Sequence, residues 1–201
     1  FVRREIFDAR AAVTLDLHSG FGLRDRLWYP YARSSEPFAD LLRVRACADM
    51  LDRTLPYHVY RIEQQSESYC THGDLWDHLH DTHRRERGPE PMFLPWTLEI
   101  GSWTWVRKNP SQLLRADGPF NPIKPHRQGR AMRRHLSLLE FFWRAARNHR
   151  RWEPTAPQLE ERELPGVHDA ARIEARPAAD QDKPETDTRR SAPRSSAGER
   201  P

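Results

Sequence analysis

Large apolar side chains almost stop at Trp152, and this change limits how much of the chain can build a core. Before it the sequence is rich in Trp, Phe, Leu and Tyr, whereas residues 153–201 are mostly charged residues, Ala, Ser and Pro. A segment with so little apolar surface cannot offset the entropy that ordering removes. We therefore predict one folded unit over residues 1–152 and a disordered tail over residues 153–201.

Strand-like and helix-like segments alternate within the first 152 residues. Short apolar runs bounded by turn residues are typical of buried strands, and apolar residues at helical spacing are typical of helices packed on a sheet. The alternation favours an α/β fold with helices on the faces of the sheet. The expected strands are 11–17, 57–63 and 92–100, and the expected helices are 34–52, 74–87 and 127–151.

The segment 127–151 is the clearest helix, and its composition bears on possible partners. Its apolar stripe is too wide and aromatic to stay in water, so we expect the stripe to pack on the sheet and the arginines to form a solvated rim. The net charge of the chain is only +4, so we predict no nucleic-acid partner. The stripe comprises Met132, Leu136, Leu139, Phe142, Trp143 and Ala146, and the arginines are Arg130, Arg133, Arg134, Arg144 and Arg147.

Several other classes of protein are disfavoured. No run approaches the roughly 18 to 20 apolar residues that cross a bilayer, so we expect no membrane partner. Cys47 and Cys70 are the only cysteines, too few for a disulfide framework or a cysteine-based zinc site. Because no signal-peptide pattern is present, we predict a cytoplasmic location. The chain begins with Phe1, not Met, which leads us to expect a true N-terminus further upstream.

His18 follows directly after the apolar run 11–17. Reactive side chains of α/β sheets tend to lie where strands end. A rigid strand would hold the imidazole as a metal ligand needs, and Asp16 would point to the same side of the strand. A lone His in a loop is nevertheless more often an ordinary hydrogen-bonding group, so the residue alone does not decide between the two interpretations.

Glu99 lies inside the apolar run 92–100. An ionised carboxylate is costly there unless it is paired or used in chemistry. A Glu beside a metal-bound water is the usual general base of a metallohydrolase. The alternative is a Glu that faces solvent from an edge strand, and the residue alone favours neither interpretation.

Four short motifs occur in one order along residues 13–110. They are Asp16-Leu17-His18-Ser19, Tyr29-Pro30-Tyr31, Tyr69 with Gly73 and Asp77 at intervals of four residues, and Thr97-Leu98-Glu99. In this order they resemble the zinc carboxypeptidase family, of the carboxypeptidase A type, in the variants of a bacterial branch. Each motif is weak by itself, and four in register are fairly specific.

The resemblance implies a function and three site residues. Residues 1–152 would be the C-terminal part of a mixed-sheet metallocarboxypeptidase domain that uses Zn²⁺ to hydrolyse peptide bonds at the C-terminus of its substrate. His18 would be a zinc ligand, Glu99 the catalytic general base and Tyr69 a substrate-binding residue, with Trp76 at the floor of a side-chain pocket. The alternatives are a deacylase of acyl amino acids from the same superfamily, or a catalytically inactive, truncated binding module.

The sequence also departs from the family pattern. The family's other two zinc ligands come from a His-x-x-Glu motif well upstream of the strand, as do the Arg and Asn that bind substrate, and none of these precedes His18 here. The stretch between Tyr69 and Glu99 is also longer than in the digestive enzymes. His83-Arg84-Arg85-Glu86 has the motif's spacing, but it lies downstream at a highly charged helix end, where we predict a solvent-facing surface without a metal role. His72, His78 and His80 are expected to be surface groups or groups that support a ligand.

Overall fold

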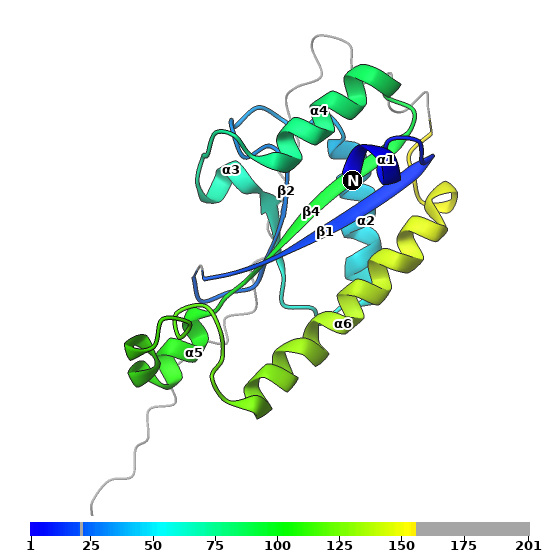
Figure 1. Ribbon diagram of the computed structural model, residues 1–201. Helices are drawn as coiled ribbons and strands as arrows, with labels where there is room; N and C mark the ends of the chain where they lie inside the picture. The colour runs from blue at the N-terminus through cyan, green and yellow to red at the C-terminus, as the bar shows by residue number, and fades with distance from the viewer. Residues whose placement is uncertain (21, 156–201) are drawn as a thin grey trace, which may run out of the picture.

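The computed structural model describes residues 1–20 and 22–155, so nearly all of the predicted tail lies outside the described residues. Four strands form one mixed sheet with helices around it, which confirms a mixed α/β fold (Figure 1). The sheet order is β1-β4-β2-β3. The strands are β1 (Ala11–Ser19), β2 (Arg26–Tyr29), β3 (Arg61–Gln64) and β4 (Met92–Ile100).

Helices cover both faces of the sheet. α2 and α6 contribute buried residues to the main core on one face, and α1 and α4 pack on the other face around Phe93. The α-helices are α1 (Val2–Ile6), α2 (Leu41–Thr54), α3 (Gln65–Ser68), α4 (Leu75–Arg87), α5 (Trp103–Lys108) and α6 (Pro125–Arg147), and the 3₁₀ helices are η1 (Pro110–Leu114) and η2 (His149–Arg151).

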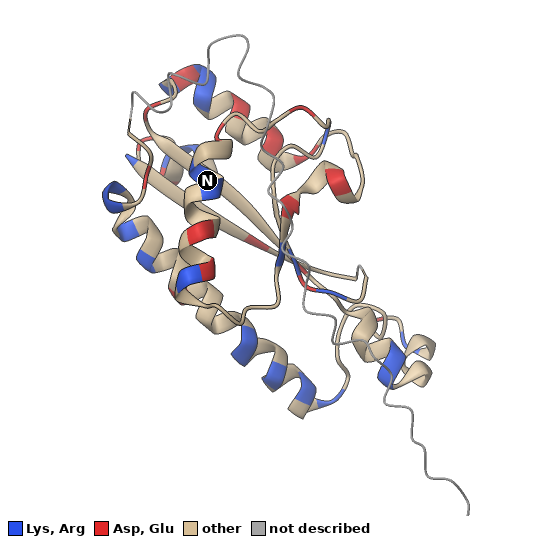
Figure 2. Cartoon of the chain, turned by 180° about the vertical axis from the view of Figure 1, so that it is seen from behind, with Lys and Arg blue, Asp and Glu red and all other residues tan. Residues whose placement is uncertain are grey.

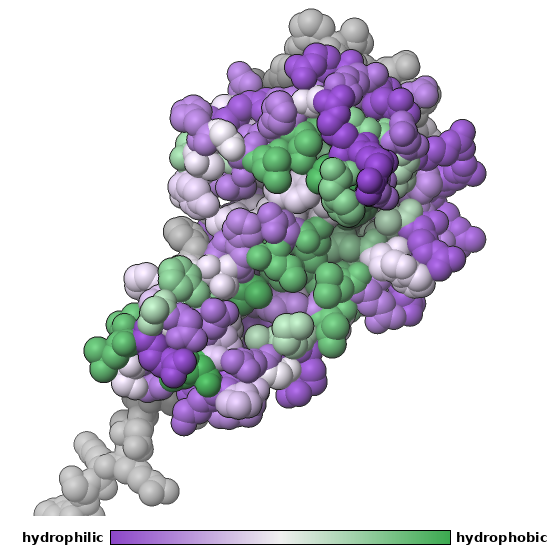
Figure 3. Space-filling model, viewed as in Figure 1, coloured by the Kyte–Doolittle hydropathy of each residue, from purple (hydrophilic) through white to green (hydrophobic). Residues whose placement is uncertain are grey.

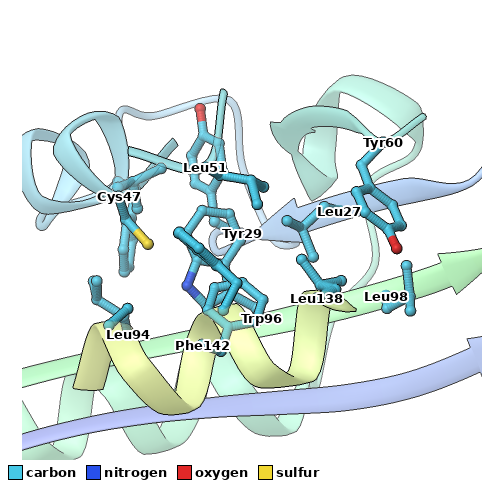
Figure 4. Packing of buried hydrophobic residues seen from close by; sticks show 14 of the residues in the cluster. Leu27, Tyr29, Cys47, Leu51, Tyr60, Leu94, Trp96, Leu98, Leu138 and Phe142 are labelled. Atoms are coloured by element: carbon cyan, nitrogen blue, oxygen red, sulfur yellow. The ribbon is translucent and has the colours of Figure 1, made fainter. Parts of the chain in front are cut away.

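β4 is the central strand of the sheet, and its prediction as a strand is confirmed. It pairs parallel with β1 and antiparallel with β2. Its side chains are buried on both sides, as a continuous apolar run requires. Met92, Leu94, Trp96 and Leu98 point into the main core, where Trp96 meets the ring of Phe142 from α6 (Figure 4).

The expected strand 57–63 is only partly correct. β3 begins at Arg61, and Tyr57 is 95% exposed. The aromatic and β-branched composition suggested a strand, but only residues from Arg61 onward find a partner, in β2. Pairing, more than composition, decides where a strand begins.

The helix expected over residues 34–52 begins later, at Leu41. Residues 34–37 are instead held as an irregular segment, because the side-chain amide of Gln64 donates to the carbonyl oxygens of Ser34 (3.0 Å) and Glu36 (2.9 Å). A contact between segments far apart in the sequence thus replaces the expected helix start.

α4 begins and ends where the sequence predicts. The carboxylate of Asp74 accepts hydrogen bonds from the backbone N–H groups of Trp76 (2.8 Å) and Asp77 (3.0 Å), which is the role of an N-cap residue. Gly88 follows the last turn with φ +79°, a conformation that residues with a Cβ rarely adopt. Of the residues expected to point inward, Leu79 is buried, whereas Leu75 is exposed.

The expected orientation of α6 is wrong for most of its predicted stripe. The helix buries His135, Leu138, Phe141, Phe142 and Ala145. The exposed large apolar residues are Met132, Leu136, Leu139 and Trp143. Both sets have helical spacing, so periodicity could not choose between them, and only Phe142 was correctly predicted to face the sheet.

Candidate functional site

The parallel pairing of β1 with β4 places His18 opposite Glu99, at the carboxyl ends of both strands. Paired residues of neighbouring strands point to the same face of a sheet. The prediction that the two residues lie together at one end of a shared sheet is therefore confirmed. The alternative of a solvent-facing Glu on an edge strand is wrong, because β4 has a neighbour on each side and Glu99 is only 5% exposed.

Asp16 orients the imidazole of His18. Its Oδ2 lies 3.1 Å from Nε2 of His18 and accepts a hydrogen bond from the indole of Trp76 at 3.0 Å. Burial raises the pKa of Asp16, but the hydrogen bonds from Trp76 and His18 outweigh burial and hold the pKa below its ordinary value. An ionised Asp16 requires a proton on Nε2, which leaves the lone pair of the neutral ring on Nδ1.

An ion cluster on β2 and β3 lies beside Glu99. Arg26 stands opposite Glu99 in the antiparallel pairing, and its guanidinium donates to Glu63 (2.5 Å) and to Ser68 (2.5 Å). Arg61 also pairs with Glu63, and Trp28 donates to it at 3.1 Å. Burial raises the pKa of Glu63, and the hydrogen bonds from Ser68, Trp28 and Arg26 bring it below its ordinary value.

Sequence reasoning missed Arg26 and Glu63. Their signal was available, since each is a charged residue next to apolar ones in a short strand. The pairing that brings them beside Glu99 joins residues 35 apart between β2 and β3 and 69 to 73 apart between β2 and β4, however, and no local pattern encodes it.

Tyr69 lies over the same face of the sheet. Its ring meets the ring of Trp28 edge-on, with the centroids 5.6 Å apart. Trp28 is the partner of Thr97, two residues before Glu99, so Tyr69 borders the side of the sheet to which Glu99 and His18 point. Tyr69 is partly exposed, as a residue that contacts a substrate must be.

Asp77 has a structural role in this arrangement. Its buried carboxylate accepts hydrogen bonds from the backbone N–H groups of Ala32 (3.0 Å) and Arg33 (3.0 Å). Burial raises the pKa of Asp77, and these hydrogen bonds only partly oppose that rise. Asp77 thereby ties α4 to the segment that follows β2, where the Pro30–Tyr31 peptide bond is cis.

The described residues do not complete a metal site. Within 1–20 and 22–155, no group of three or more His, Cys, Asp and Glu side chains could hold a metal ion. His18 alone cannot retain zinc, because catalytic zinc sites generally use three protein ligands. His18 fits the role of one ligand and no more.

Two histidines of α4 are buried. His80 is buried, not at the surface, and its Nε2 lies 2.7 Å from Asp40. His83 is also buried, between the rings of Phe7 and Phe93, so the expected solvent-facing surface at residues 83–86 is wrong for this residue. Burial among these apolar rings is the main cause that lowers the pKa of His83 below its ordinary value.

Comparison with known proteins adds no relative. No family model, curated protein or solved structure matches this chain. In the part of the chain that the structure describes, no helix is long and apolar enough to cross a membrane.

Proposed function

We propose that this chain carries part of the catalytic site of a zinc-dependent hydrolase that cleaves peptide bonds at the C-terminus of its substrate, within a metallocarboxypeptidase-like domain. The observation that carries the proposal is the pairing of His18 with Glu99. Neighbouring strands lie about 4.8 Å apart. A metal ligand and a general base at that separation can share one water, which is what the reaction requires.

Each residue has a distinct role in the proposed reaction. His18 offers Nδ1 as a metal ligand, and Asp16 keeps the ring in the required tautomer through Nε2. Zinc, when bound, would supply a water with a pKa lowered to about 7. Glu99 accepts the proton of the attacking water and returns it to the leaving amine. Tyr69 contacts the substrate from the side of Trp28.

The second candidate is a catalytically inactive binding module. It is favoured by the missing donors, since the described residues hold no group of three that could ligate a metal. The two candidates differ in one measurable respect: only the hydrolase needs zinc ligands from outside the described residues, so the test uses the complete polypeptide that the gene encodes.

The test compares two variants of that complete polypeptide with a matched control. Glu99→Gln should retain zinc and lower peptide hydrolysis by about 100-fold or more, the usual contribution of a general base. His18→Ala should lose zinc together with activity. Glu86→Gln, an exposed Glu in the 83–86 segment, should change neither. Metal content is measured by atomic absorption and hydrolysis by mass spectrometry of unblocked peptides.

The 201-residue chain by itself should bind zinc weakly and hydrolyse nothing measurable. Tight, stoichiometric zinc with turnover in that chain would contradict the proposed ligand set. A complete polypeptide without zinc or hydrolysis would favour the inactive module.

A further inference from the structure

β1 is an outermost strand of the sheet, and within the described residues only β4 pairs with it. The N–H of Met92 donates to the carbonyl of Arg10 at 3.0 Å, and the parallel register continues from there. In a parallel ladder this pattern directs the backbone groups of even-numbered β1 residues toward β4. The N–H and C=O groups of Val13, Leu15 and Leu17 therefore point to the open edge.

The side of α6 away from the core adds an apolar stripe. Met132 is 61% exposed and Trp143 is 58% exposed, and Leu136 and Leu139 lie between them at helical spacing. α6 packs against β1, and Figure 3 shows hydrophobic side chains gathered between the two elements. We call this region the edge surface: the backbone edge of β1 at Val13, Leu15 and Leu17, and the α6 stripe of Met132, Leu136, Leu139 and Trp143.

The backbone of the edge surface restricts what can bind to it. A row of N–H and C=O groups at a strand edge is satisfied in full only by another extended chain. On the α6 side Val13 and Leu15 already pack against the main core, and Leu17 is 54% exposed. The added strand must therefore direct apolar side chains toward α6.

The charge of α6 restricts the partner further. The guanidinium of Arg147 lies 4.8 Å from the ring centre of Trp143 at one end of the stripe, and Arg133, one residue after Met132, lies about 100° further around the helix at the other end. Figure 2 shows basic residues along the helix, and Glu140 is the only acidic residue of α6. A second copy of this chain would bring one basic helix against another, which is unfavourable.

We propose that the edge surface binds a β-strand of a different protein, with alternate apolar residues facing α6 and acidic residues at both ends near Arg133 and Arg147. The strand pairs with the odd-numbered residues of β1 and extends the sheet to five strands. The interaction is independent of the chemistry at His18 and Glu99.

The probes are synthetic 12-residue peptides with alternating Val and Thr between terminal pairs of Glu, and the same peptides with Lys in place of Glu. Binding to the 201-residue chain is measured by fluorescence anisotropy. The Glu peptide should bind at least about tenfold more tightly than the Lys peptide, and this difference in affinity should shrink as salt is added. Two further probes carry N-methyl groups on all the Val or on all the Thr residues. One of these should fail to bind, because either the Val or the Thr N–H groups face β1.

Variants of the stripe test the location. Leu136→Glu should weaken binding of the Glu peptide at least about tenfold, since the substitution places a carboxylate in the apolar contact. Leu114→Glu, at a site that is 91% exposed on η1, is the matched control and should bind normally. Circular dichroism checks that both variants fold.

Amide exchange followed by NMR gives the decisive readout. The amides of Val13, Leu15 and Leu17 should exchange fast in the free chain and slowly with the Glu peptide, whereas Thr14 and Asp16 should be protected in both states. Failure of both unmethylated peptides to bind, equal binding by the Glu and Lys peptides, or unchanged exchange at the odd-numbered amides would each overturn the proposal. Concentration-dependent protection of these amides without peptide would overturn it in favour of a second copy.

Discussion

β1 and β4 make a direct comparison. Both have nine residues, run in the same direction and pair residue for residue, and each carries one of the two residues at the candidate site. Yet β4 is buried almost throughout, whereas β1 is only partly buried and open along one edge. β4 carries more and larger apolar side chains than β1, and it also has a neighbouring strand on each side. The site joins a buried strand that holds Glu99 to a partly buried strand that holds His18.

The largest expected effect is the difference in the free energy of unfolding that is lost when a side chain of each strand is truncated. Trp96→Ala in β4 should lower the free energy of unfolding by about 3–5 kcal/mol, because it leaves a large cavity between the sheet and α6. Leu17→Ala in β1 should cost below about 1 kcal/mol, because much of that side chain already contacts water. Urea denaturation measures both, and equal losses would show that β1 is as well covered as β4.

The same comparison can be made between adjacent residues of α6. Leu138→Ala should cost about 2–5 kcal/mol, since that side chain is fully buried against the core. Leu139→Ala should cost below about 1 kcal/mol when nothing is bound at the edge surface. Thermal unfolding of both variants measures the difference, and reversed values would mean that the other stripe faces the sheet.

The smallest effect concerns pH and the β1 side of the site. Because the folded-state pKa of Asp16 lies below its ordinary value, the ionised carboxylate stabilises the fold above that ordinary value, and the stabilisation is lost as pH falls through the lowered pKa. Trp76→Phe removes one hydrogen bond to Asp16 and should raise its pKa. Carbon-13 NMR titration of the Asp16 carboxyl measures the shift, with Trp143→Phe as an exposed control that should leave it unchanged. A Trp76→Phe titration that coincides with wild type would show that Trp76 does not control Asp16.

The sequence by itself determined the features that depend on nearby residues. Apolar residues occupy both odd and even positions of 92–100, which predicts a strand buried on both faces. An Asp at the N-cap and a Gly after the last turn are sufficient to bound α4. The placement of His18 and Glu99 at strand ends also followed from local pattern. The two residues lie at the same end of the sheet because their strands belong to one sheet and run parallel.

Only the tertiary structure decided features that depend on distant segments. α6 has two apolar stripes, and packing in the main core, not periodicity, distinguishes the one with Leu138. The cluster of Arg26 and Glu63 exists because β2 joins β3 to β4. His83 is buried because α1 brings Phe7 against it. Helical and strand periodicity report that a side of an element is apolar, but which apolar side is covered depends on what the rest of the chain places against it.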